Sequence, residues 1–392
     1  MSRFSLKRAL AIFFKEFVQL RRDRVSAGMI IGVPLMQLLL FGYAINNDPH
    51  HLPAAVMAHD NGQFARAVVS ALEQTAYLDV VHKPTSREAM DALLRQGRVT
   101  LAVTIPHDFT RRVMKRETPT ILVEADASDP TAAASAINAV MGLPEYALMH
   151  DLHENLRGDA TFDGTLLAGM TGAGGPPFSI TLHRLFNPEN ITAFHIVPGL
   201  LGTILTLTLV MMTAMAVTRE NERGTMEFLL ATPLRPMEIM AGKLLPYVFV
   251  GIVQVALILF AAATLFSVPM ARTMAGWLAL SLGAFLFILC NLCLGYLIST
   301  VAKNQLQAMQ MSFFYLMPSI FLTGFAFPFY GMPLWARTLG EFLPTTHFLR
   351  IVRGALLKEQ TLADTGPELM ALGLIVIVIA VGAIARSRTT LD

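Results

Sequence analysis

The stretch ITAFHIVPGLLGTILTLTLVMMTAMAV, residues 191–217, decides the fold class, because His195 alone interrupts its apolar character. A helix needs about 20 mostly apolar residues to cross the hydrocarbon core of a bilayer. Comparable blocks occupy residues 25–45, 244–270, 274–302, 306–329 and 369–385. The sequence therefore predicts a polytopic α-helical membrane protein with six transmembrane helices, one before and five after a long polar insert.

The composition of the whole chain agrees with this pattern. Hydrophobic residues make up 54% of the 392 residues and charged residues 15%, against about 25% charge in soluble domains. A net charge of +2 excludes the strongly basic field of a nucleic-acid-binding protein. The first block is too long for a signal peptide, lacks a small-residue cleavage site and follows a basic segment, residues 1–24.

Basic residues near the ends of the spans predict the orientation in the membrane. Seven lie in residues 1–24, four in residues 218–243 and two more in the tail, all on one side if six spans exist. The short loop near residue 270 carries only Arg272. Both termini are therefore expected in the cytoplasm and residues 47–190 outside it. Four basic residues of segment 330–366 fit this rule less well: Arg337, Arg350, Arg353 and Lys358.

The N-terminal segment, residues 1–24, has the pattern of an amphipathic helix. Its apolar residues recur at near-helical spacing and include Phe13 and Phe17, while Arg21 and Arg22 belong to its basic face. Such a helix lies in the membrane interface. The alternative is that it forms the cytosolic start of a longer first span, residues 25–46.

The insert, residues 47–190, alternates between strand and helix patterns. Strands are expected at 54–57, 77–81, 99–105, 120–124 and 179–185, and helices at 64–74, 86–96, 108–116 and 132–156. Residues 158–177 are rich in glycine and lack periodicity, which is typical of a linker. This alternation predicts an inserted extracytoplasmic α/β domain between the first and second spans.

No catalytic or metal-binding constellation stands out. His150 and His153 have the spacing of helical metal ligands, although a solvated polar helix face explains them as well. Cys290 and Cys293 lie within a predicted span, where they act as small apolar residues. The phosphate-binding pattern G-x-x-x-x-G-K-[ST] is absent. We therefore expect no enzyme activity and no bound cofactor or metal, and any ATP and Mg would bind a separate ATPase chain.

The loop 218–241 contains the most specific stretch, RENERGTMEFLLATP at residues 219–233. Residues 225–231 have the pattern of a short amphipathic helix that Pro233 ends. A partner can grip a short rigid helix on such a loop and thereby move the attached spans. On composition alone, a plain hairpin connector explains the loop equally well.

Several motifs, taken in order, resemble the ABC-2 type permeases, the membrane subunits of one class of ABC exporter. The first is Glu222-x-Gly224-Thr225-x-Glu227, continued by Leu230 and Thr232-Pro233 and then by Gly242-Lys243-x-x-Pro246-Tyr247. Others are Phe186-Asn187-Pro188-Glu189, Val197-Pro198-Gly199, Gln305-Leu-Gln-Ala308, Met317-Pro318-Ser319, Gly324-Phe325-x-Phe327-Pro328, Met332-Pro333-x-Trp335, Pro344-x-Thr346-His347-Phe348 and Val352-Arg353-Gly354. In the insert, Ile105-Pro106-x-Asp108-Phe109 resembles the multidrug-exporter-like branch with a large extracytoplasmic domain.

The resemblance implies an assembly and assigns roles to residues. It implies a second permease, identical or related, a cytoplasmic ABC ATPase subunit, and a periplasmic adaptor as a further partner, in the inner membrane of a bacterium. It implies that the N-terminal helix is an elbow, and that residues 242–392 hold spans three to six with re-entrant outer helices near 330–362. The residues that would couple to the ATPase are Glu220, Glu222, Gly224, Thr225, Glu227, Leu230 and Pro233.

Polar residues within or near the spans are candidates for a transport path, because their burial in lipid is costly. They are Gln37, His195, Gln254, Asn291 and His347. The alternative is that they form hydrogen bonds between helices or are otherwise structural. No ionised residue lies in the middle of a span, which disfavours an ion-coupled carrier.

These observations favour a permease subunit of an ATP-driven exporter. It would move hydrophobic, drug-like or lipid-like small molecules out of the cytoplasm or the inner membrane. The alternative is an assembly scaffold or mechanotransmission protein that transports nothing and acts on an outer partner through the insert.

Overall fold

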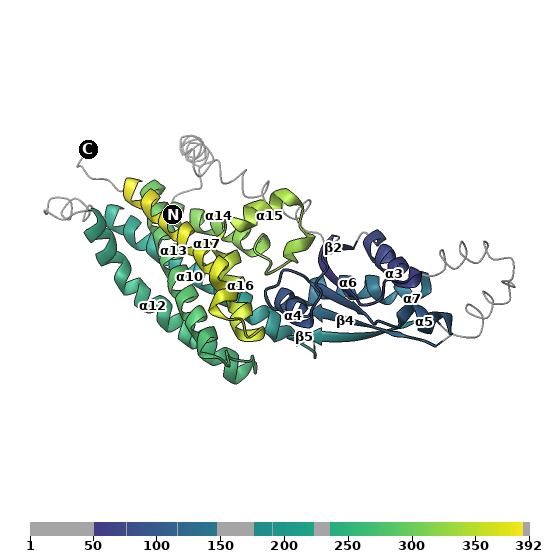
Figure 1. The fold of residues 1–392 in the computed structure, drawn as a ribbon. Coiled ribbons are helices and arrows are strands. Elements are labelled where there is room, and N and C mark those ends of the chain that lie inside the picture. The colour runs from purple at the N-terminus through teal and green to yellow at the C-terminus, as the bar shows by residue number, and fades with distance from the viewer. Residues whose placement is uncertain are drawn as a thin grey trace, which may run out of the picture.

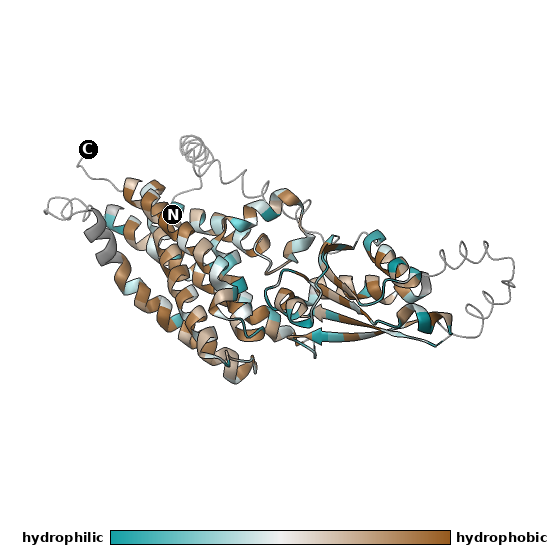
Figure 2. Cartoon of the chain, in the orientation of Figure 1, coloured by the Kyte–Doolittle hydropathy of each residue, from teal (hydrophilic) through white to brown (hydrophobic). Residues whose placement is uncertain are grey.

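The long apolar blocks fold as a helix bundle, and the insert folds as a sheet-based region beside one end of it (Figure 1). The structure is a computed structural model that describes residues 51–75, 77–115, 117–146, 176–189, 191–222 and 236–386. Figure 2 shows that apolar residues dominate the long helices, whereas the insert mixes polar and apolar residues. The division into spans and insert therefore matches the sequence pattern.

The insert contains a five-stranded sheet with the strand order β2-β1-β3-β4-β5. All neighbouring strands are parallel except β3 and β4. The inner strand β1 is buried on both faces, so it has the continuous apolar sequence typical of parallel sheets. The strands are β1 (Leu52–Ala58), β2 (Leu78–His82), β3 (Leu101–Ile105), β4 (Thr120–Asp126) and β5 (Ser179–Leu185), which confirms all five predicted strands with small shifts at their ends.

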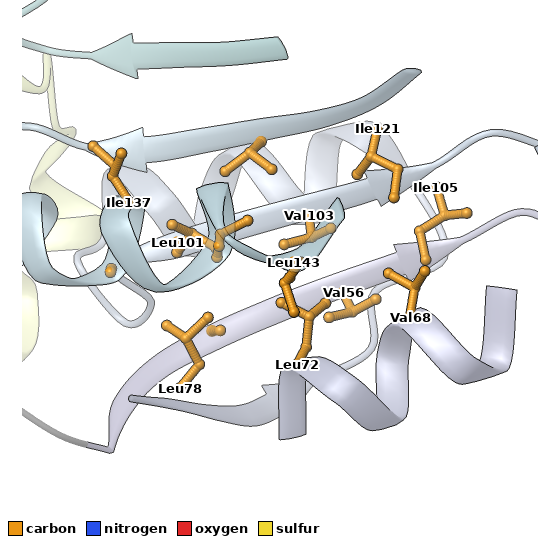
Figure 3. Packing of buried hydrophobic residues seen from close by; sticks show 14 of the residues in the cluster. Val56, Val68, Leu72, Leu78, Leu101, Val103, Ile105, Ile121, Ile137 and Leu143 are labelled. Carbon is orange, nitrogen blue, oxygen red and sulfur yellow. The ribbon is translucent and has the colours of Figure 1, made fainter. Parts of the chain in front are cut away.

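Helices cover both faces of this sheet. α3 (Gln63–Gln74), α5 (Phe109–Met114), α6 (Pro130–Met141) and α7 (Leu143–Tyr146) share one apolar core with the sheet, and α4 (Arg87–Arg95) covers the other face. Figure 3 shows Val68 and Leu72 of α3 pointing toward the sheet residues Val56 and Ile105. These contacts bury the apolar face that the helical period of α3 predicts.

The predicted helix over 132–156 was too long. α6 ends at Met141, and the short α7 begins at Leu143. Gly142 favours a break because its backbone loses much entropy in a helix, and Pro144 lacks the N–H that would bond to the carbonyl four residues earlier. Residues 147–156, with His150 and His153, and most of the predicted linker lie outside the described residues.

Within the described residues, four helices have the length and composition to cross a membrane. They are α10 (Thr192–Glu222), α12 (Pro236–Leu265), α13 (Met274–Val301) and α17 (Leu362–Arg386). The predicted first span, residues 25–46, and the predicted elbow helix, residues 1–24, lie outside the described residues.

The block 306–329 does not form one uninterrupted helix as predicted. α14 (Gln305–Phe321) has 17 residues, which corresponds to about 26 Å of helix against a hydrocarbon core of about 30 Å. The chain then turns at Gly324, whose φ of 81° is in the left-handed region. A hydropathy window does not detect this turn, because the residues after it are still apolar.

Short helices occupy the region where re-entrant helices were expected, near 330–362. They are η2 (Phe329–Gly331), α15 (Leu334–Glu341) and α16 (Pro344–Leu357). α16 is almost wholly buried and packs against α10, α13 and α17. The rings of Phe348 on α16 and Phe287 on α13 stack with centroids 4.2 Å apart. α16 is therefore an internal part of the bundle, whereas α15 leaves Leu334 and Trp335 exposed.

The ends of the long helices gather at two opposite ends of the bundle. α10 begins next to β5, so its first residue lies at the end that carries the insert, here called the insert end. The opposite end, here called the far end, collects the C-terminal ends of α10, α13 and α17 and the N-terminal ends of α12 and α14 (Figure 1). The loop 223–235, which contains most of the predicted coupling element, leaves the described bundle at the far end.

Candidate functional site

The far end of the bundle holds a polar junction where the predicted coupling loop departs. The carboxylate of Glu222, the last residue of α10, accepts a hydrogen bond from the backbone N–H of Gln305 at 2.9 Å. Its second oxygen accepts another from the side-chain amide of Gln305 at 2.5 Å. Arg219 Nε donates to the amide oxygen of Gln305 at 3.3 Å. The last turn of α10 is thus held on the first residue of α14.

Local sequence explains why α14 begins at this junction. Asn304 is the N-cap and accepts from the N–H of Gln307 at 2.8 Å. The first N–H groups of a helix have no partner within the helix, and an anion near them is favoured by the helix dipole. Glu222 supplies that anion from another helix.

Only part of the predicted coupling element can be placed. Glu222 lies in the junction. Glu220 lies two residues earlier, in the last turn of α10, and is half-buried. The other predicted coupling residues lie outside the described residues, as do the elbow residues: Gly224, Thr225, Glu227, Leu230, Pro233, Phe13, Phe17, Arg21 and Arg22.

Two of the predicted path residues take part in helix packing. Gln254 on α12 accepts a hydrogen bond from Thr208 on α10 at 3.0 Å. Asn291 is fully buried on α13 and donates to the carbonyl of Phe287 at 2.9 Å. Gln37 lies outside the described residues. Gln254 therefore forms a hydrogen bond between helices and Asn291 one within its own helix, as expected of structural residues. Their role in a transport path remains a prediction.

The other two, His347 and His195, lie at the insert end. His347 on α16 places Nδ1 2.5 Å from Glu368 of α17 and Nε2 2.8 Å from the carbonyl of Glu341. Arg350 donates to Glu341 at 2.6 Å and to Glu368 at 3.3 Å, and its guanidinium lies 4.6 Å from the ring centre of Phe329. These groups join α15, α16 and α17 in one ionic cluster.

His195, at the start of α10, contacts a different arginine. Arg353 Nη2 donates to His195 Nδ1 at 3.0 Å and to the carbonyl of Gly324 at 3.1 Å. The carbonyl of Ser128 in the insert lies 3.4 Å from the same Nδ1 atom. Arg353 therefore links the first turn of α10 to the turn after α14, and the carbonyl of Ser128 places the edge of the insert beside them.

Direct contacts fasten the insert to the bundle. Lys358 and Asp126 form a buried ion pair, and the side-chain amide of Gln360 donates to the carbonyl of Arg95. The hydroxyl of Tyr330 donates to the carbonyl of Gly97 at 3.1 Å. We call this set of contacts between the insert and segment 330–364 the clamp.

A cavity of about 500 Å³ lies within the clamp. The insert lines it with Asp126, Ser128 and Asp129, and the bundle lines it with Arg350, Arg353 and Lys358, among other residues. None of the four predicted path residues that the structure describes lines it, although His195 contacts Arg353 and His347 contacts the lining residue Glu368. Sequence reasoning treated Arg350 and Arg353 only as awkward interfacial charges. The available signal was the clustering of four basic residues in an otherwise apolar half of the chain.

Asp60, in the loop after β1, has a structural role in the insert. Asp60 follows β1 and accepts the N–H of Gly62 at 2.7 Å and that of Thr110 at 2.6 Å. Burial acts to raise the pKa of Asp60, but these hydrogen bonds outweigh it and hold the pKa below its usual value. Asp60 therefore joins β1 to the segment that follows the Ile105-Pro106 motif.

The described residues offer no group of three or more histidine, cysteine or acidic side chains that could hold a metal. Cys290 and Cys293 are unbridged and buried in α13. This agrees with their prediction as apolar residues of a span.

Comparison with known proteins gives consistent matches along the chain. Residues 27–385 match the family described as ABC-2 family transporter protein. The chain is 29% identical over 355 residues to the Escherichia coli protein named "Probable multidrug ABC transporter permease YbhS", covering 90% of this chain and 89% of that protein. It is 25% identical over 351 residues to "Probable multidrug ABC transporter permease YbhR", covering 89% of each chain. It is also 25% identical over 328 residues to "Inner membrane transport permease YhhJ", covering 82% of each. No solved structure matches the chain significantly.

Proposed function

The chain belongs to the ABC-2 family of transporter proteins, and from this premise we propose that it is the permease subunit of an ATP-driven exporter. It forms the transport path together with a second permease, and a separate ATPase chain supplies the ATP and Mg. The cargo we propose is a hydrophobic small molecule, drug-like or lipid-like. The names of the bacterial relatives support the multidrug class.

The junction at the far end is the observation that carries this proposal. A transport path driven from outside the membrane needs a rigid connection between the element that the ATPase contacts and the transmembrane helices. Glu222 lies where the loop 223–235 begins, and its carboxylate is bonded to Gln305 at the start of α14. A displacement of this loop therefore acts on α10 and α14 together.

The charge distribution supports a bacterial inner membrane with the far end in the cytoplasm. Arg219, Lys303 and Arg386 lie at the far end, as the positive-inside rule requires of a cytoplasmic face. The basic residues of segment 330–366, which fit the rule less well, include two with acidic partners: Arg350 with Glu341 and Lys358 with Asp126. The insert is then extracytoplasmic, where a periplasmic adaptor can reach it.

The central experiment is co-purification of the chain with the ATPase, followed by measurement of ATPase stimulation and of ATP-dependent uptake into inverted vesicles. Glu227→Arg reverses a charge of the proposed coupling element, and we expect it to abolish both association and stimulation. Glu189→Arg, an exposed position at the insert end, is the matched control and retains both. Wild-type association and stimulation by Glu227→Arg would contradict the coupling assignment.

A second candidate function is mechanotransmission without transport, which the clamp favours. The ion pair between Lys358 and Asp126 joins the insert firmly to the α16–α17 connection, so movement of these helices also moves the insert. ATP-dependent changes in the protease accessibility of the insert, combined with no uptake of any hydrophobic probe, would favour this function. ATP-dependent uptake favours the exporter.

A further inference from the structure

The cavity inside the clamp is enclosed by groups of opposite charge, and most of them are already paired. Lys358 pairs with Asp126, and Arg350 pairs with Glu341 and Glu368. Asp364 accepts hydrogen bonds from Gln96 at 2.9 Å and from the hydroxyl of Thr361 at 2.9 Å. Asp129, the remaining acidic residue of the lining, accepts the N–H of Ala132 at 3.3 Å. The acidic side chains of the lining are therefore engaged, which argues against a cationic ligand.

Arg353 differs from the other basic residues of the lining. Within the described residues its guanidinium forms no ion pair, and its acceptors are His195 Nδ1 and the carbonyl of Gly324. The carboxylates of Asp129 and Asp126, which also line the cavity, attract it through space without a hydrogen bond to it. Its Nε atom is buried and has no acceptor there. Arginine remains charged in proteins, so this side chain brings a positive charge to the cavity without a bonded counterion. A charged group in such surroundings is costly unless an anion completes the site.

The rest of the lining indicates the form of the ligand. Arg98 of the insert is exposed and also lines the cavity. Phe329, Tyr330, Leu349 and Val99 add apolar and aromatic surface. A volume of about 500 Å³ lies within the range of small-molecule sites. The cavity can thus hold a charged head and part of an apolar tail.

We propose that this cavity binds the anionic head, a carboxylate or a phosphate, of an amphiphile, with Arg353 as the main binding residue and Arg98 at the entrance. The planar fork of a guanidinium matches both anions and forms paired hydrogen bonds with them. The head belongs either to a membrane phospholipid or to an anionic cargo. The assignment deepens the proposed function, since the cavity then lies on the outer side of the transport path.

The test measures binding without the ATPase, so its outcome is independent of export. The purified full chain is placed in nanodiscs of phosphatidylcholine, and binding of a fluorescent fatty acid is competed with dodecanoate, dodecyl phosphate or dodecyltrimethylammonium. Both anions should compete at concentrations at least tenfold lower than the cation. Equal competition by the cation would overturn the proposal. If the chain binds the anions but supports no export, the proposed exporter function is refuted and the proposed binding site stands.

The variants identify the residue responsible. Arg353→Gln should weaken binding of the fatty acid about tenfold or more, whereas Arg337→Gln should leave it unchanged, because Arg337 donates to the carbonyl of Met332 outside the cavity. If Arg353→Gln does not fold, Arg98→Glu provides the same test at an exposed position and should also weaken binding. Wild-type affinity in the folded variants would overturn the assignment.

A final arm separates the two sources of the anion. Phosphatidylglycerol added to the nanodiscs should lower the apparent affinity of the wild type for the fatty acid, and not that of Arg353→Gln, if the ligand is a lipid. An unchanged wild-type affinity assigns the site to a free amphiphile. Both results support a site for an anionic head.

Discussion

Gln305→Ala should separate ATP hydrolysis by the partner from movement of the transmembrane helices. The substitution removes the side-chain hydrogen bond to Glu222 and the acceptor of Arg219, while the backbone N–H of residue 305 remains. A hydrogen bond to a charged group contributes about 1.5–3 kcal/mol, and exposure reduces this value. We expect the free energy of interaction between α10 and α14 to fall by about 1.5 kcal/mol at this exposed junction. This corresponds to about a tenfold change in the equilibrium constant for their association.

The assay for this prediction compares ATPase activity with export in one reconstituted complex. We expect ATP-dependent uptake into inverted vesicles to fall about tenfold, while the ATPase remains bound and active. The melting temperature should change by only a few degrees, because such a loss is small against the entropy of unfolding of a chain of this length. A double-mutant cycle of Gln305→Ala with Glu222→Ala measures the coupling directly, because residues in contact give non-additive effects. Full export by Gln305→Ala, together with additive effects in the cycle, would refute the role of this junction.

Three further predictions concern the insert and its clamp. Arg87→Ala removes both hydrogen bonds, of 2.5 and 2.6 Å, from the carboxylate of Glu124, which is 2% exposed. We expect it to lower the free energy of unfolding by about 2 kcal/mol or more, and Glu124→Gln should recover part of this loss. An unchanged melting temperature would contradict the pairing. Lys358→Met leaves the buried carboxylate of Asp126 without its ion-pair partner and should cost about 3 kcal/mol of unfolding free energy. Lys358→Met with Asp126→Asn, which keeps an oxygen to accept the N–H of Ser128, should cost clearly less. Equal costs in both variants would count against a buried pair. Asp60→Asn should lower the melting temperature at pH 7, because folding lowers the pKa of Asp60 and its carboxylate therefore stabilises the fold. This stabilisation is fully present above the unfolded pKa of about 3.9 and is lost as the pH falls through the folded pKa. A melting-temperature difference that is constant from pH 7 down to pH 3 would argue against this linkage.

Local patterns predicted the elements of the insert well, because burial against the sheet follows the period of each segment. β5 has the predicted bounds, and the helix predicted over 64–74 is α3 with one additional residue at its start. The errors arose where one backbone position overrides a hydropathy average. Gly324 turns the chain after α14, and Gly142 with Pro144 divides the predicted helix over 132–156.

The junctions were less accessible to sequence reasoning, because their partners lie far apart in the chain. Lys358 and Asp126 are separated by 232 positions, and Arg353 and His195 by 158. No periodicity relates such residues, so the charges of segment 330–366 appeared only as exceptions to the orientation rule. Glu222 was selected from its motif, whereas its partner Gln305 was quoted in another motif and received no role. Tertiary structure was needed to bring the two motifs together.

α14 connects the two sites physically. Its first residue, Gln305, is bonded to Glu222 at the far end. The turn that follows its last residue presents the carbonyl of Gly324 to Arg353 in the clamp cavity. A packed helix moves largely as a rigid body, and a coupling mechanism requires an element whose position both sites influence. α14 has a hydrogen-bonded contact at each end, so under the proposed coupling we expect a shift of loop 223–235 to change the position of the acceptor that helps to hold Arg353. We expect the proposed anionic ligand of Arg353 to act on the same helix in turn, because binding free energies coupled through one element must be reciprocal.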